Sequence, residues 1–271
     1  MSDELLRGFA PITPSAWQMI DQEASRVLQV HLTARRLIQT RGPLGWDHSA
    51  VNSGRATRLE EYGGSAVQTL VREVQPMLEL RAPFELARDE LESIGRGNPA
   101  PDLSPLTEAA RNIAAAEDRL VYTGLASAFV RGMHSHSEHE PVALDGDYHN
   151  YPDAVALAFE RLRRAGVGGP YAMALGTRCF SGLNTTTTVG GYPVLEHVRR
   201  IVDGPIIAVP VLDGALVLSQ RGGDFELVLG RDLSVGYSDH DARSVRLYFE
   251  ESLTFRLLGP SAAVPLVYQS E

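Results

Sequence analysis

The chain has 271 residues, 44% hydrophobic and 22% charged, so it is long enough to bury a sizeable core, and its net charge of −9 argues against nucleic acid as a partner. No apolar run approaches the roughly 18 residues of a membrane-spanning helix, and the N-terminus lacks a secretory signal, so we expect a cytoplasmic protein with no membrane partner. All 25 basic residues are arginines, which excludes Schiff-base and P-loop lysines, and a single cysteine, Cys179, excludes an internal disulfide.

The first predicted element is a helix that begins at Thr13, a favourable N-cap, with Pro14 at the first helical position. Residues then recur at helical spacing along two neighbouring stripes, of which the first is apolar. The first stripe carries Trp17, Ile20, Ala24 and Val27, and the second carries Leu28, Leu32, Arg35 and Gln39. Two such stripes need two neighbours, although a core helix inside its own domain is the simpler interpretation.

Residues 47–86 form the next predicted element, a long two-stranded excursion. The pattern is mostly extended and is interrupted by a turn at EYGGS (61–65) around Gly63 and Gly64. An isolated hairpin of this length is only marginally stable in water. We therefore expect it to lie against something else.

The rest of the chain mixes helices and strands without a regular alternation. Helices are predicted from Ser104 and over 153–165 and 194–202, a strand over 171–175, a glycine- and threonine-rich loop over 183–193, and strands after Pro205 that include a half-buried strand over 245–255. This order predicts an α+β fold and argues against a Rossmann domain or a TIM barrel.

The stretch HSHSEHE (134–140) is the strongest candidate for a metal site. Its histidines lack the spacing of a zinc-binding helix, so we favour a solvated loop and predict no metal ligand. Glu250 and Glu251 point to opposite faces of their strand and do not form an acid/base pair. Cys179 is expected to be buried or idle. No catalytic residue is predicted, and a metal-dependent enzyme remains a remote alternative.

Taken in order, several motifs resemble those of the encapsulins, bacterial shell proteins once classed as linocin-type bacteriocins. The similarity spans about residues 5 to 267. It is carried by GFAPITPSAWQMID, RGPLGWDHSAV, ELRAPFELARDELESIGRG, AEDRLVYTG, GVGGPYAMAL, GGYPVLEHV, RGGDFELVLGRDLSVGY and VRLYFEESLTFRLL.

The resemblance implies an HK97-type capsid fold. Residues 1–40 would hold the N-terminal helix, and 41–86 the extended arm called the E-loop. The P-domain would comprise 87–132 and 220–271, including a C-terminal strand associated with the E-loop. The A-domain would comprise 133–219.

The resemblance also implies two sites. A lumenal groove for the C-terminal peptide of a cargo protein would involve Leu28, Leu32, Arg35, Ile38, Gln39, Leu233, Val235 and Tyr237. A five-fold pore would be lined by Asn184, Thr185, Thr186, Thr187, Thr188, Val189, Gly190 and Gly191, which carry no charge. The family member that binds flavin stacks it on a tryptophan, and Asp89 stands at the matching position here, so no cofactor is expected.

The resemblance to the encapsulins also implies a function. The chain would be a non-catalytic shell protein that assembles with itself, most simply as sixty copies (T=1), and packages a ferritin-like protein or a dye-decolorising peroxidase. A capsid protein of a defective prophage that packages DNA is the alternative, and the negative net charge disfavours it.

Overall fold

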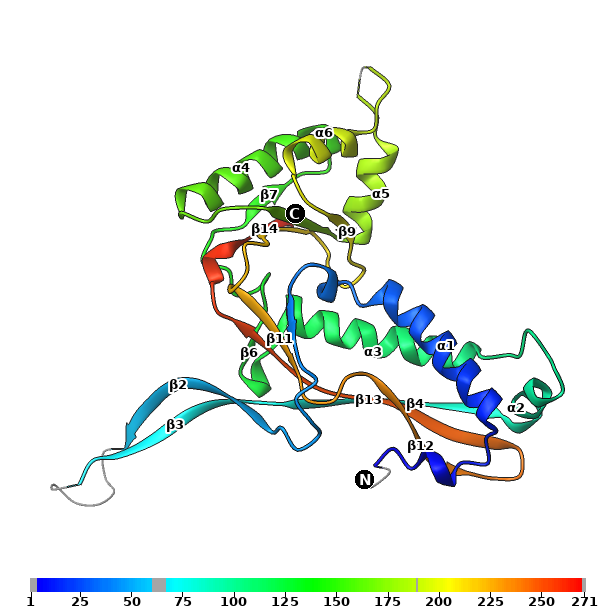
Figure 1. Ribbon diagram of the computed structural model, residues 1–271. Coiled ribbons are helices and arrows are strands. Elements are labelled where there is room, and N and C mark those ends of the chain that lie inside the picture. The colour runs from blue at the N-terminus through cyan, green and yellow to red at the C-terminus, as the bar shows by residue number, and fades with distance from the viewer. Residues whose placement is uncertain (1–3, 60–66, 189, 270–271) are drawn as a thin grey trace.

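The computed structural model describes residues 4–59, 67–188 and 190–269. Figure 1 shows two sheets, each with its own helices, and a long two-stranded arm that extends away from both. The mixture of helices and strands confirms the predicted α+β class.

Five strands form the first sheet, in the order β1-β11-β13-β12, with β4 paired to the other edge of β13. Their bounds are β1 Gln39–Arg41, β4 Leu78–Ala87, β11 Phe225–Leu229, β12 Ser234–His240 and β13 Ser244–Leu257. Strand β13 was predicted to be half-buried, and that prediction is wrong because both of its faces are covered over nearly its whole length.

Three helices pack with this sheet around one core: α1 (Pro14–His31), α2 (Arg88–Gly95) and α3 (Ser104–Tyr122). Helix α1 begins as predicted, since the Thr13 hydroxyl accepts a hydrogen bond from the backbone N–H of Ala16 at 3.3 Å. Its buried residues include Ile20, Ala24 and Leu28. None of the described helices is both long and apolar enough to cross a bilayer.

The second sheet has the order β7-β14-β10-β8-β9. Its strands are β7 Val142–Leu144, β8 Tyr171–Leu175, β9 Ile206–Ala208, β10 Ala215–Ser219 and β14 Ala263–Tyr268, and the helices around it are α4 Tyr151–Arg164, α5 Thr177–Thr185 and α6 Val194–Ile201. Strand β14 pairs with β7 and β10, so the expected boundaries need a correction: the end of 220–271 completes the sheet of 133–219.

Strands β2 (Ala50–Leu59) and β3 (Thr69–Pro76) form the arm, and most of their side chains are exposed. The predicted arm, 41–86, is longer than the observed one, because β1 pairs with β11 and β4 pairs with β13. The predicted turn at Gly63 and Gly64 lies outside the described residues.

Short elements complete the chain. They are the hairpin β5 (Gly124–Leu125) and β6 (Val130–Arg131), and the 3-10 helices η1 Arg7–Phe9, η2 Ala34–Arg36, η3 Ala126–Ala128, η4 Tyr148–Asn150 and η5 Pro260–Ala262. Among these, η1 and η2 flank α1 and define the two ends of the hollow described next.

Candidate functional site

A hollow of about 560 Å³ lies between the exposed side of α1 and the beginning of β12. We call it the groove. Its apolar lining comprises Leu5, Ala24, Leu28, Leu32, Leu233, Val235 and Phe249, and its polar lining comprises Arg7, Asp21, Ser25, Gln29, Arg35, Arg36, Asp232 and Ser234. An apolar floor with a charged rim suits a short peptide with alternating apolar side chains.

The structure brings five of the eight predicted cargo-binding residues into the groove. These are Leu28, Leu32, Arg35, Leu233 and Val235. Ile38 and Gln39 instead line a neighbouring hollow beyond Arg36. The side chain of Tyr237 is buried, and its hydroxyl bonds to Nδ1 of His240 at 2.6 Å.

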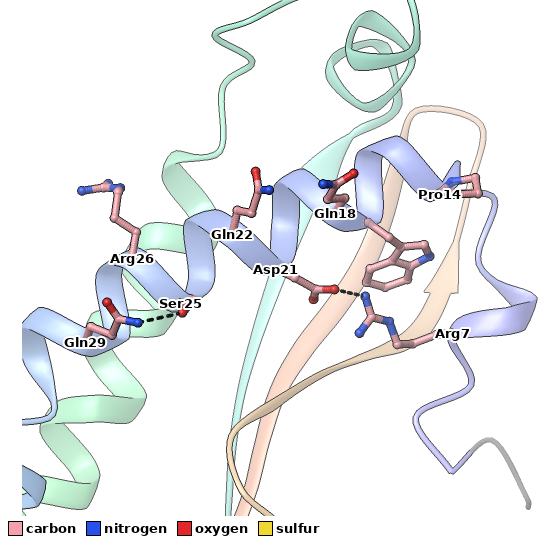
Figure 2. Close-up of a pocket in the computed structure, with 9 residues that line it drawn as sticks. Arg7, Pro14, Gln18, Asp21, Gln22, Ser25, Arg26 and Gln29 are labelled. Carbon is pink, nitrogen blue, oxygen red and sulfur yellow. Dashed lines mark hydrogen bonds and ion pairs between the residues drawn. The ribbon is translucent and has the colours of Figure 1, made fainter.

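A second hollow continues along α1 from the groove and shares Arg7, Asp21, Ser25 and Gln29 with it. Figure 2 shows Arg7 reaching back from the N-terminal segment to the helix. Its guanidinium lies 3.9 Å from the ring centroid of Trp17 and donates to Oδ2 of Asp21 at 2.8 Å. Leu5 and Arg7 were missed in the sequence, because nothing local indicates that the segment before Thr13 folds back onto α1.

Arg35 is bound by carboxylates of its own chain. Its guanidinium donates to Oε2 of Glu117 at 2.6 Å, to Oδ1 of Asp232 at 2.8 Å and to Glu251. Glu117 and Glu251 are fully buried. Burial and the negative charge of Glu117 raise the pKa of Glu251 well above its ordinary value. Arg35 therefore anchors η2 to α3 and β13, rather than offering a free cation to a ligand.

Asp118 fixes the chain where α1 ends. Its carboxylate accepts from the Thr33 hydroxyl at 2.6 Å and from the backbone N–H of Ala34 at 2.9 Å. Burial raises the pKa of Asp118 to about 6, although these hydrogen bonds act in the opposite direction. Together with Arg35, Asp118 sets the position of the groove wall that carries Leu32.

The predicted pore loop follows α5 and projects beyond the helices of the second sheet (Figure 1). Asn184 and Thr185 form the last turn of α5 and donate to carbonyls of that helix at 2.8 and 3.0 Å. Thr188 N–H donates to the Tyr192 carbonyl, and Gly191 N–H to the Thr188 carbonyl, each at 2.8 Å. Val189 lies outside the described residues.

His149 ties the loop to η4 and was not predicted. Its Nδ1 lies 2.7 Å from Oδ1 of Asp147, and its Nε2 lies 3.2 Å from the carbonyl oxygen of Thr187. The hydrogen bond to Asp147 and the carbonyl of Thr187 raise the pKa of His149 above its ordinary value. The pair Asp147-x-His149 in DYHN was the available sequence signal, but its partner is 38 residues away.

The histidine tract lies against η5. Nε2 of His139 lies 2.8 Å from the carbonyl oxygen of Ser261, and Nδ1 of His136 lies 2.9 Å from the hydroxyl of Ser135. His134 is partly buried, and this burial lowers its pKa. Within the described ranges, no three side chains of the metal-binding types are grouped so that they could hold an ion.

Comparison with known proteins shows which family the chain belongs to. A family model described as an encapsulating protein for peroxidase, Linocin_M18, matches residues 2–254. The chain is 51% identical to the type 1 encapsulin shell protein of Rhodospirillum rubrum, over 97% of this chain and 96% of that protein. The chain belongs to the encapsulin family. It is also 39% identical to the type 1 encapsulin shell protein of Mycobacterium tuberculosis, over 97% of this chain and 99% of that one.

Solved structures confirm the HK97-type capsid fold of this encapsulin. A virus-like particle from Pyrococcus furiosus matches with a TM-score of 0.64 at 19% identity, covering 91% of this chain and 98% of that one. The capsid of the Myoviridae phage XM1 matches with a TM-score of 0.56 at 14% identity, covering 88% and 92%. The encapsulins are structural proteins, and the expectation of a non-catalytic chain is confirmed by membership in this family.

Proposed function

We propose that the chain assembles with copies of itself into a closed icosahedral shell, most simply of sixty subunits (T=1), in the bacterial cytoplasm. The observation that carries the proposal is the full-length similarity to proteins named as shell proteins. The arm supports it, because Leu70, Val71 and Val74 are at least half exposed and bury little against their own chain. Apolar side chains on a long hairpin gain stability only from a neighbouring surface.

The first experiment measures assembly. We expect the purified protein to elute from a size-exclusion column as particles far larger than one 29.5 kDa chain and to appear as closed shells in negative-stain micrographs. A monomeric chain at working concentration would contradict the proposal. The absorbance ratio at 260 and 280 nm after nuclease treatment tests the alternative, a DNA-filled prophage capsid, which the likeness to the phage XM1 capsid favours and the charge of −9 disfavours.

The cargo is a peroxidase or a ferritin-like protein whose C-terminal peptide occupies the groove. The description of the family as encapsulating proteins for peroxidase supports the first of these. The apolar floor formed by Leu28, Leu32 and Leu233 supports the site. Many copies of the groove facing one lumen would hold cargo firmly even when each peptide binds with modest affinity.

The second experiment changes the chemistry of the groove, and the variants are compared as assembled shells. Leu28→Glu places a charge on the apolar floor, and we expect the amount of co-purifying cargo per shell to fall at least about tenfold. Val30→Glu is the matched control, because Val30 is on the same helix, 63% exposed and outside the groove lining. Equal loading of both variants, measured by quantitative mass spectrometry, would rule out the groove as the cargo site.

The loop from Asn184 to Gly191 forms the five-fold pore in this proposal. Hydroxyls, an amide and glycines would give it a polar and uncharged lining. Such a lining admits small ions and solutes with little preference for charge.

A further inference from the structure

Residues at the start of β12, Ser234 and Val235, line the groove. Strand β12 pairs with β13 on one side only, with Val235 opposite Phe249 and Tyr237 opposite Leu247. In an antiparallel pair, the backbone groups of successive residues point alternately toward and away from the partner strand. The N–H of Tyr237 donates to the Leu5 carbonyl at 2.8 Å and so points away from β13.

The same alternation directs the backbone of Val235 away from β13. Among the described residues, neither its N–H nor its carbonyl oxygen has a backbone hydrogen-bond partner across that edge. Val235 is 4% exposed and lines the groove. A donor and an acceptor therefore stand at a largely buried position, where polar backbone groups ordinarily find a partner.

The two sides of the groove differ in chemistry. One side is the helix α1, with Ala24 and Leu28, followed by its C-cap residue Leu32. The other side is the start of β12, where the backbone of Val235 has no partner among the described residues. An extended peptide has a matching arrangement, because its backbone groups lie in one plane and its side chains alternate above and below that plane.

We propose that the cargo peptide binds by adding a strand to the edge of β12, pairing its backbone with that of Val235 while its apolar side chains pack on α1. The inference rests on the proposed function, since it names the binding mode of the same groove. The pairing ties the register of the peptide to β12, and the α1 side selects apolar residues at alternate positions. The bond from Tyr237 to Leu5 shows that this edge accepts an added segment.

Two substitutions at Val235 distinguish the contribution of its backbone N–H to cargo binding from that of its side chain. Val235→Pro removes the N–H, and proline is tolerated on a strand edge whose N–H faces outward. Val235→Ala keeps the N–H and shortens the side chain. We expect shells of the proline variant to load about tenfold less cargo than shells of the alanine variant, because one backbone hydrogen bond to the peptide is lost.

A test on the peptide leaves the shell unchanged. The probe is a fluorescein-labelled peptide of about fifteen residues that copies the C-terminus of the cargo that co-purifies with the shell. Its affinity for empty shells is compared with that of peptides methylated at one backbone nitrogen at a time. We expect methylation at alternate positions to weaken binding about tenfold, because only every second residue pairs with β12.

The outcomes distinguish this binding mode from the proposed function. If Leu28→Glu abolishes probe binding but no methylation matters, the groove holds the cargo and strand addition is wrong. If Leu28→Glu has no effect, both proposals fail. If Val235→Pro lowers the stability of empty shells and leaves loading unchanged, the edge is closed by the chain's own N-terminal residues, and strand addition is also overturned.

Discussion

Both ring nitrogens of His149 face oxygen acceptors, the carboxylate of Asp147 and the carbonyl of Thr187. A neutral imidazole has one N–H, and only the protonated ring can donate to both oxygens. Because Asp147 carries the charge, the neutral ring keeps its proton on Nδ1 and directs a lone pair at the Thr187 carbonyl. The attachment of the loop after α5 to η4 therefore depends on the protonation of one exposed side chain.

We therefore expect the stability of the loop after α5 to depend on pH. The pKa of His149 is raised in the folded chain, so its stabilising contribution is complete below the ordinary value of about 6.5 and is lost as the pH rises through the raised value. We expect amide hydrogen exchange in the loop, corrected for intrinsic rates, to speed up across that rise.

The control for this dependence is His149→Gln. Glutamine does not titrate, so the increase in amide exchange with pH should be absent in this variant. A step of equal size in the variant would show that another group governs the loop.

The buried ion pairs of Arg35 give a second prediction at this scale. Arg35→Leu leaves Glu117 and Glu251 buried without a cation, and breaking a buried pair in this way costs about 3–5 kcal/mol. We expect the free energy of unfolding, measured by denaturant titration, to fall by about that amount.

Arg36→Leu is the matched control for Arg35→Leu. Arg36 is the next residue along, is exposed and has no ion pair within the described part of the chain. An exposed substitution of this kind shifts the free energy by about 0.5 kcal/mol or less. If Arg35→Leu lowered the free energy of unfolding no more than Arg36→Leu does, the ion pairs of Arg35 would not anchor η2.

The resemblance to the encapsulins placed Arg35 at the groove but did not reveal its ion pairs. Its partners Glu117, Asp232 and Glu251 lie 82 to 216 positions away along the chain. Helical spacing indicates which residues share a face, and it says nothing of which distant carboxylates meet that face.

Local sequence signals located several elements well. The Thr13 cap gives the start of α1, and the apolar run at 171–175 coincides with β8. Helix α5 was missed because Gly182 lowers helix propensity in its middle. That glycine has a tertiary cause: a Cβ there would lie 2.0 Å from Cζ of Tyr148. The contact with Tyr148 therefore requires a glycine at a helical position, and this glycine hid the helix from a prediction based on local propensity.

Strand β13 shows the other limit of pattern reasoning. Its alternation predicted one face exposed to solvent, but Glu250 and Glu251 are buried on opposite sides, and each forms an ion pair with an arginine. A charged residue in a strand usually indicates solvent. Here, Arg35 on one side and Arg231 on the other make that inference wrong.

The arm provides a prediction at the scale of an element. Leu70 is 55% exposed on β3 and belongs to neither core, so Leu70→Glu should leave the subunit folded and impair association. We expect the assembled fraction at a given concentration to fall about tenfold by light scattering, while the circular dichroism spectrum is unchanged.

Leu70→Met, which keeps an apolar side chain of similar volume, is the matched control for the arm and should assemble normally. Normal assembly of the glutamate variant would mean that this part of the arm meets no neighbour.

At the scale of the whole molecule, the resemblance to the encapsulins predicted the capsid fold, and composition alone would not have done so. The sequence did not reveal how the chain crosses between the two sheets. Strand β14 runs parallel to β7, more than a hundred residues earlier, and antiparallel to β10. Register between strands so far apart depends on the complete tertiary structure, which no local periodicity encodes.

The central place of β14 in the second sheet bears on biosynthesis. Strand β7 is attached to that sheet only through β14, among the strands described. Until the ribosome has synthesised β14, which begins at Ala263, β7 has no strand partner and one edge of β10 is unpaired. The second sheet therefore cannot be completed before the last residues of the chain have been made. A polypeptide that ends before Ala263 would lack the strand that joins β7 to β10, so it could not complete this sheet.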